Sequence, residues 1–480
     1  MLRLAELIKE RNAEREFLFV ISIICTLGGF LFGYSTGVTN GASSFIQTDL
    51  HLLLTDVGYI TGSLLIGAAF GALLGGHLAD KFGRRAVTFG NSFLFVFGTL
   101  GSSLAPNLLL IIFARILLGI AVGNASASVP IFLAELAPSE KRGQMVSINE
   151  FMIVFGQFIA FLTNAILGNI WADNPQIWRW MLILGIIPSL ILLFGTWLVI
   201  PESPRWLISI SKNKKALEIL KQIRENEIQA INELEQIEEL VENDKKLNEE
   251  KMSIITIFLN EKWLYNCLLI GIGIALCQQS TGVNSIMFYG TEILRETGFS
   301  NQIALIANIF NGLISVLAAL ISIWLLGKIS RRRMFICAQF GVIIVHLLIG
   351  LSELFLQNGT LKGFLVLSLC VIFLAFQQGS ISPITWLLLA EIFPLKIRGL
   401  AISICTFLLW ILNALIGIFF PIFSINLGIG QTFILFSILN IFAIIFSFLY
   451  LPETKGKSLE ELEQQFISQD WKLIRRLGKK

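Results

Sequence analysis

The sequence predicts an all-α polytopic membrane protein with twelve transmembrane helices in two six-helix halves. The chain of 480 residues is 55% hydrophobic and only 14% charged, a composition too apolar for a soluble core of this length. Its apolar runs are about 20 residues long, which suffices to cross about 30 Å of hydrocarbon. Three short motifs of the first half also return, in the same order, in the second half.

The apolar runs define the expected helices in chain order. The first run follows a charged, amphipathic segment that has no cleavable signal-peptide pattern, so this run is expected to be its own insertion signal. We expect spans near residues 17–39, 57–79, 87–106, 109–134, 144–168, 180–200, 263–291, 302–327, 334–352, 363–390, 399–425 and 430–451.

Lysine and arginine concentrate in alternate connections between these runs. They cluster in KFGRR (81–85), EKRG (140–143) and KISRRR (328–333), whereas the connection 40–56 contains neither residue. The positive-inside rule therefore predicts that both termini are cytoplasmic. The expected location is a cell membrane, inner or plasma. The net charge of +3 reflects this asymmetry, and no nucleic-acid partner is predicted.

The repeated motifs indicate an internal duplication. ELAPSEKRG begins at residue 135 and EIFPLKIRG at residue 391, an offset of 391 − 135 = 256, and PESPRW and PETKGK are offset by 452 − 201 = 251. FGRR in the first half likewise matches ISRRR in the second. Six spans per repeat give both halves the same orientation, related by an axis along the membrane normal. The expected units are a six-helix half at 1–200, a cytoplasmic helical linker at 201–262, a second half at 263–451 and a cytoplasmic tail at 452–480.

Taken together, the motifs resemble the sugar porter family of the major facilitator superfamily. The resemblance rests on GGFLFGYSTGV at 28–38, GGHLADKFGRR at 75–85, PIFLAELAPSEKRG at 130–143, PESPRWL at 201–207, QQSTGVN at 278–284, WLLLAEIFPLKIRG at 386–399 and PETKGKSLEELE at 452–463. It implies the major facilitator fold and transport of a monosaccharide, a hexose or a pentose, by alternating access. Transport is expected as a proton symporter or a facilitator, without a cofactor. A polyol or another small polar metabolite is the alternative substrate, and a sugar sensor that carries no flux is a third interpretation.

Polar side chains within the apolar runs mark the expected substrate site, because they are costly in hydrocarbon unless they face a partner or a watered cavity. Amides both donate and accept hydrogen bonds and so match sugar hydroxyls, while aromatic rings cover the apolar C–H face. Gly282 is expected to interrupt the seventh span. Helix packing is the alternative role of the two tryptophans. From the residues and the resemblance, the expected contacts are Gln278, Gln279, Asn284, Trp386, Trp410, Asn413, Phe32, Tyr289 and Gln157.

Three residues bear on proton coupling. In proton-coupled sugar porters the residue after GY is typically an aspartate, paired with an arginine that corresponds to Arg115, but here it is Ser35. A hydroxyl does not titrate near neutral pH, so Ser35 cannot carry a proton. Glu150 stands where the family usually has a glutamine and is a candidate proton carrier. The alternatives for Glu150 are a permanent ion pair with Arg115 and a protonated acid that only bonds substrate hydroxyls.

The charged motifs at the cytoplasmic helix ends predict ion pairs that latch the two halves together when the cytoplasmic side is closed. Guanidinium groups pair bidentately with carboxylates and bond helix C-terminal carbonyls. Membrane topology alone is the alternative explanation for these arginines. The expected latch residues are Asp80, Arg84, Arg85, Glu135, Arg142, Glu202, Arg205, Glu391, Arg398 and Glu453.

No enzyme is predicted. His51, His77 and His346 are scattered, the cysteines have no CxxC spacing, and no GxxxxGK[ST] nucleotide loop is present. The sequence therefore predicts neither a metal site nor ATP-driven pumping. The expected partners are a sugar, protons if transport is coupled, and the lipid bilayer.

Overall fold

The computed structural model describes residues 2–138, 142–224, 226–249, 262–394, 398–455, 461–462 and 466. Within these residues every regular element is helical, and twelve stretches are long and apolar enough to cross a membrane. The predicted all-α fold with twelve spans is therefore confirmed.

The first half consists of six spans. Five are single helices, and the sixth, Ile177–Leu198, combines two helices joined by a turn. In chain order the helices are α1 (Leu2–Leu50), α2 (Leu54–Phe82), α3 (Arg84–Leu104), α4 (Leu108–Leu136), α5 (Arg142–Ile170), α6 (Ile177–Ile183) and α7 (Ile186–Leu198).

Three helices precede the second half, which again has six spans. The three are α8 (Pro204–Ser209), α9 (Asn213–Ile223) and α10 (Glu227–Glu249). The spans are built from α12 (Lys262–Ser280), α13 (Val283–Glu296), α14 (Asn301–Lys328), α15 (Arg331–Phe355), α16 (Thr360–Phe376), the π-helix η1 (Gln377–Ile381), α17 (Ser382–Ile392), α18 (Arg398–Asn426) and α19 (Ile429–Tyr450).

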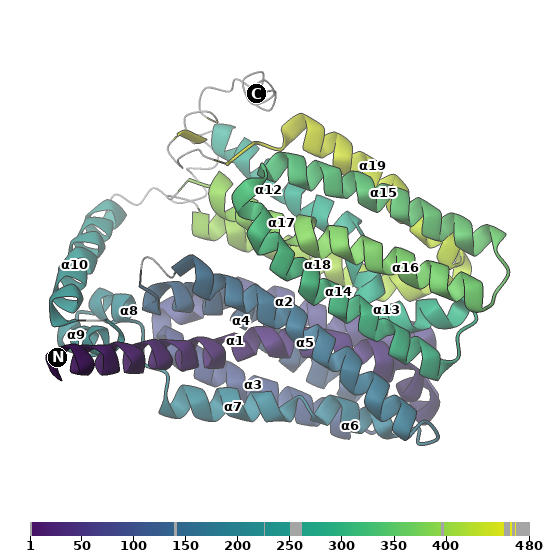
Figure 1. Ribbon diagram of the computed structural model, residues 1–480, viewed down its shortest axis with the longest axis horizontal. Helices are drawn as coiled ribbons and strands as arrows, with labels where there is room; N and C mark the ends of the chain where they lie inside the picture. Colours follow the sequence, from purple (N-terminus) through teal and green to yellow (C-terminus); the bar gives the residue numbers. More distant parts are fainter. Residues whose placement is uncertain are drawn as a thin grey trace.

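The two halves lie side by side, with the first half along one edge of the view and the second half along the other (Figure 1). Helices α8, α9 and α10 lie together at one end of the bundle, beside the beginning of α1. We call this the linker end and the opposite one the far end. The chain therefore crosses from the linker end to the far end in α1 and returns in α2.

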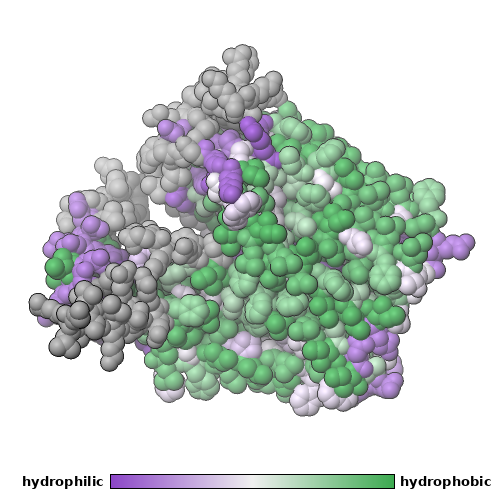
Figure 2. Space-filling view, in the orientation of Figure 1, coloured by the Kyte–Doolittle hydropathy of each residue, from purple (hydrophilic) through white to green (hydrophobic). Residues whose placement is uncertain are grey.

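The surface between the two ends is apolar. Figure 2 shows hydrophobic residues over the body of the molecule and hydrophilic residues gathered at its ends. Large side chains such as Phe97, Trp197 and Phe442 are more than half exposed. A continuous exposed apolar surface of this kind fits hydrocarbon and is unfavourable in water. The chain is an integral membrane protein.

Helix α1 is longer than the apolar run at 17–39 predicts, because it continues to Leu50. Its polar residues are compatible with the helix, since Thr36 donates to the carbonyl of Gly33 at 2.8 Å and Thr39 to that of Ser35 at 3.1 Å. Gly33 packs directly on α5, where a Cβ atom would lie 1.8 Å from a backbone oxygen. Small residues let the two helices approach this closely.

Two spans of the second half are interrupted. The predicted break at Gly282 is present, and this residue adopts φ +64°, a conformation that glycine tolerates best. The second interruption, η1, is a π-helix that begins at Gln377 and ends just before Pro383. A proline cannot donate the backbone hydrogen bond that would continue the α-helix, and π-turns are frequent at functional sites.

Candidate transport site

The two halves are hydrogen-bonded to each other at the far end. The amide of Asn40 in α1 donates to the carbonyl of Met287 at 2.7 Å and accepts from the backbone N–H of Thr291 at 2.8 Å. Near the end of α1, Ser44 donates to Asn301 at 3.2 Å. Asn40 is absent from the expected site residues, although an amide within an apolar run is the signal that marks it.

No hydrogen bond or ion pair between described residues of the two halves occurs at the linker end. Two further hydrogen bonds between described residues of the two halves, from Asn40 to the carbonyl of Ile286 and from Asn169 to that of Gln302, also lie at the far end. The structure is thus a state in which the far end is closed by polar contacts.

The expected amides of the second half lie around the break at Gly282. Gln279 is 2% exposed, accepts from Asn284 at 2.9 Å and donates to Gln278 at 3.4 Å. The break therefore brings these three amides into one hydrogen-bonded group. The sequence predicts the break and the presence of these amides on the same span. Their role toward a substrate stays a prediction.

Residues from both halves also meet between α1 and α18. The rings of Phe32 in α1 and Trp410 in α18 pack edge to face with centroids 5.1 Å apart. One turn beyond Phe32, Thr36 accepts a hydrogen bond from Gln157 of α5 at 3.3 Å. Buried polar atoms of Gln157 (Oε1), Trp410 (Nε1) and Asn413 (Oδ1) have no hydrogen-bond partner among the described residues. These atoms are available to a hydroxylated ligand between the halves.

Two other expected contacts are placed differently. Tyr289 is 1% exposed, its hydroxyl donates to the carbonyl of Gly417 at 2.6 Å, and its ring stacks on Phe420. The hydroxyl hydrogen of Tyr289 is therefore engaged in the bond that joins α13 to α18, and in this state it is not free to bond a substrate. Trp386 in α17 is half-buried and packs against the hydrophobic core of the second half.

Arg115 lies in the outer third of α4, counted from the far end, and is 2% exposed. Its Nη1 donates to the backbone carbonyl of Ser35 at 3.0 Å, while Nε and Nη2 have no partner in the described part of the chain. Insertion scales assign a cost of about 3 kcal/mol to an arginine at the centre of a span. The guanidinium thus links α4 to α1 through one hydrogen bond, and two of its three nitrogens remain without one.

The interpretation of Glu150 as an ion-pair partner of Arg115 is wrong for this state. No ion pair joins the two side chains, and Glu150 is exposed near the linker-end start of α5. Helices α4 and α5 run in opposite directions, so at 1.5 Å per residue the two positions are roughly 20 Å apart along the bundle. Glu150 instead lies two turns from Gln157 on the same face of α5, because residues seven apart share a face.

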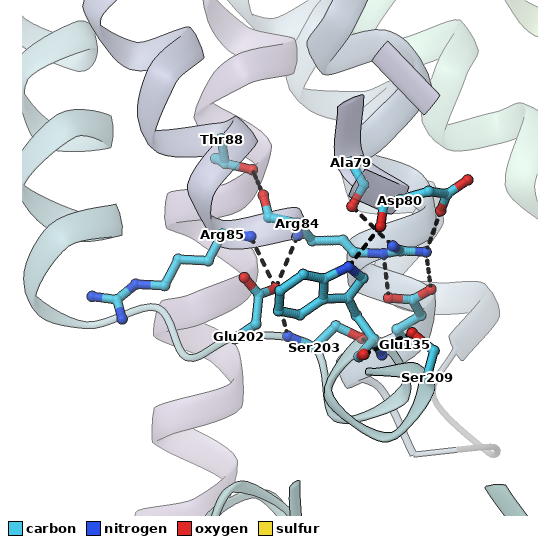
Figure 3. A network of polar contacts seen from close by, with 10 residues as sticks. Ala79, Asp80, Arg84, Arg85, Thr88, Glu135, Glu202, Ser203 and Ser209 are labelled. Atoms are coloured by element: carbon cyan, nitrogen blue, oxygen red, sulfur yellow. Dashed lines mark hydrogen bonds and ion pairs between the residues drawn. The ribbon is translucent and has the colours of Figure 1, made fainter. Parts of the chain in front are cut away.

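A network of charges ties helix ends together at the linker end of the first half (Figure 3). Arg84 pairs bidentately with Glu135 at 2.9 and 3.0 Å and contacts Asp80 at 3.0 Å. Glu202 accepts hydrogen bonds from the backbone N–H groups of Arg84 and Arg85 at 2.9 and 3.1 Å. Burial raises the pKa of the Glu202 carboxyl, and these N–H groups oppose the rise.

The second half repeats this arrangement with different partners. Glu453 accepts from the backbone N–H of Arg331 at 3.1 Å, and Arg331 contacts Glu391 at 3.6 Å. Arg398 donates to the carbonyl of Phe393 at 3.1 Å. Among the described residues both networks stay within their own half in this state, so these residues do not form the predicted latch between the halves.

Arg205 and Arg142 are the remaining expected latch residues. Arg205 is half-buried at the start of α8. The side chain of Arg142 lies outside the described part of the chain.

Comparisons with known proteins agree with this architecture. The family model described as "Sugar (and other) transporter" matches residues 21–466. The major myo-inositol transporter IolT of Bacillus subtilis (strain 168) is 46% identical over 96% of this chain and 97% of its own. The arabinose-proton symporter of the same organism is 34% identical over 95% of this chain and 97% of its own.

A solved structure has the same fold. The inward open conformation of the xylose transporter XylE from E. coli superposes with a TM-score of 0.79 at 29% identity, covering 93% of this chain and 99% of that one. The fold is the major facilitator fold, and the matches are to transporters, not to enzymes. This chain belongs to the sugar (and other) transporter family.

Proposed function

We propose that this transporter carries a neutral monosaccharide, a hexose or a pentose, by alternating access between its two halves. The observation that carries the proposal is the set of unpartnered polar atoms on Gln157, Trp410 and Asn413, which come from both halves. Amides and an indole N–H suit the mixed donors and acceptors of vicinal hydroxyls. The Phe32 and Trp410 rings supply apolar faces for the C–H surface of the sugar.

The described state is proposed to face the cytoplasm. The linker end carries the lysine- and arginine-rich connections, which the positive-inside rule assigns to the cytoplasmic side. The hydrogen bonds of Asn40 close the far end. The similar solved structure is likewise an inward open conformation. In the opposite state, the contacts of Asn40 open and the two linker-end networks meet as the proposed latch.

A cyclic polyol is the second candidate substrate. The observation that favours it is the 46% identity to a major myo-inositol transporter. An inositol ring presents the same alternation of hydroxyls and axial C–H groups as a pyranose, so the same amides and aromatic rings can bind it.

Proton coupling is proposed to run through Glu150. Ser35 cannot titrate near neutral pH, and Glu150 is an exposed acid on the face of α5 that also carries Gln157. Similarity to an arabinose-proton symporter supports proton coupling, and similarity to a xylose transporter supports a pentose as a substrate. A facilitator is the alternative mechanism, and the absence of an acid at position 35 is the observation that favours it.

The substrate proposal is tested by competition. Purified protein in proteoliposomes takes up a labelled hexose while unlabelled hexoses, pentoses and inositol compete. The Gln157→Ala variant is expected to raise the half-saturating concentration about tenfold, the loss of one hydrogen bond of roughly 1.4 kcal/mol. The matched control is Gln339→Ala, since Gln339 is also buried but lies within the second half on α15. Equal effects of the two variants would contradict the proposed site.

The coupling proposal is tested with an imposed inward proton gradient. Wild-type protein is expected to accumulate substrate above equilibrium only with the gradient, and Glu150→Gln to equilibrate substrate without accumulating it. Accumulation by the variant would exclude Glu150 as the proton carrier. Equilibration by the wild type, regardless of the gradient, would establish the facilitator instead.

A further inference from the structure

Arg115 is a buried cation whose charge nothing on the described chain balances. Its guanidinium makes one hydrogen bond, to a backbone carbonyl, and leaves Nε and Nη2 unpartnered at 2% exposure. A guanidinium cannot release its proton in a protein, so the positive charge persists. A buried charge without a partner is strongly unfavourable, and a compensating group is expected beside it.

A small cavity adjoins this guanidinium in the far-end part of the first half. Its polar lining comes from Arg115 together with Tyr34, Ser35, Thr99 and Ser102, and its free volume is about 10 Å³. That volume suffices for one particle about the size of a water molecule. The cavity lies where α1, α3, α4 and the end of α6 meet, because its polar residues belong to the first three helices and Leu182 of α6 also lines it.

The lining offers hydrogen-bond donors and no carboxylate. Tyr34 and Ser102 donate to backbone carbonyls at 2.7 Å each. The hydroxyls of Ser35 and Thr99 make no hydrogen bond to another residue in the described ranges, so both can turn toward the cavity. One small space is therefore lined by an arginine with two unpartnered nitrogens and by two residues with free hydroxyls.

We propose that this cavity binds one small monovalent anion, chloride under physiological conditions, as the counter-ion of Arg115. A halide accepts hydrogen bonds from all sides. It is somewhat larger than the single water molecule that the cavity can hold, so its binding requires a small outward shift of the lining. The surrounding low dielectric strengthens its attraction to the guanidinium. Sulfate is excluded by its size. The site is independent of the proposed sugar contacts and of Glu150.

The bound anion joins three helices of the first half. It contacts the guanidinium on α4, the hydroxyl of Ser35 on α1 and that of Thr99 on α3. Because the ion binds only the folded arrangement, its concentration must shift the unfolding equilibrium by linkage. Thermal unfolding therefore detects the ion without any measurement of transport.

The test compares purified protein in sodium chloride, sodium bromide and sodium methanesulfonate at equal ionic strength. A halide at ten times its dissociation constant is expected to raise the Tm of the wild type by about 1–2 °C over methanesulfonate. In Ser35→Asp a carboxylate occupies the cavity next to Arg115, so the Tm no longer depends on the halide. In the matched control Ser35→Ala the cavity and the guanidinium remain, and a rise of the same sign persists.

Three results would overturn the anion site. The first is a wild-type Tm that is the same in chloride and methanesulfonate, which would leave water as the partner of Arg115. The second is an undiminished halide effect in Ser35→Asp, which would place the ion elsewhere. If Ser35→Asp does not fold, Arg115→Gln replaces it, and a halide effect that survives this change is the third. Since no substrate is added, these results are separate from the success or failure of the transport proposal.

Discussion

Replacing Asn40 by alanine tests whether the far-end contacts hold the described state. Asn40 is fully buried and makes three hydrogen bonds to the other half, two to carbonyls of α13 and one from the N–H of Thr291. Hydrogen bonds contribute about 0.5–1.5 kcal/mol each. The loss in Asn40→Ala is therefore expected to disfavour far-end closure by about 2 kcal/mol, roughly 30-fold in the equilibrium between the two states.

The assay measures the distance between spin labels placed on far-end loops of the two halves. The population with the longer distance is expected to grow in Asn40→Ala. The matched control is Asn164→Ala, because Asn164 is equally buried but donates to carbonyls of Gly37 and Val38 within its own half. Equal shifts in both variants, or none in Asn40→Ala, would refute the assignment of Asn40 to far-end closure.

Three further predictions concern the packing and the linker-end network. Gly33→Ala is expected to lose about 3 kcal/mol or more of stability, because its Cβ would overlap a backbone oxygen of α5. In the control Gly76→Ala nothing lies within 4 Å of the new Cβ, so the Tm should change little. Similar Tm values of the two variants would contradict the tight contact at Gly33. Arg84→Gln removes the bidentate pair with Glu135 and is expected to lower the free energy of unfolding by about 1–3 kcal/mol. It is also expected to slow transport, and an unchanged uptake rate would contradict the latch. Burial raises the pKa of the Glu202 carboxyl in the folded protein, so ionisation of this group lowers the free energy of unfolding. As pH rises above 4.5, the Tm of the wild type should therefore fall relative to that of Glu202→Gln. A difference in Tm that does not change with pH would contradict the direction of this pKa shift.

The helical architecture could be predicted because bilayer thickness fixes the length of each apolar run. The continuation of α1 to Leu50 could not be predicted from hydropathy. Its end is mostly polar, and the helix persists because Phe45 and Ile46 are buried in the core and because Ser44 donates to Asn301 of the other half. The π-helix at Gln377 also escapes hydropathy, since a change in hydrogen-bond register leaves the apolar run unchanged.

The candidate site was predictable as a set of residue types but not as a set of contacts. The amides around Gly282 follow from their polarity inside a span. The expected pairing of Arg115 with Glu150 is absent because the polarity of a residue indicates its span but not its depth in the membrane. Counting residues from the helix ends places Arg115 near the far end and Glu150 near the linker end. The partners of Asn40 lie in α13 of the other half, and this contact depends on how the halves dock in the described state.

The most direct test of alternating access is counterflow in proteoliposomes. Vesicles are loaded with unlabelled sugar and diluted into a trace of labelled sugar, with protein-free vesicles as the control. Alternating access predicts a transient overshoot of label inside the vesicles, since unlabelled sugar occupies the site on the inner side and drives exchange. Label that enters without overshoot or saturation, at the rate of protein-free vesicles, would contradict the account.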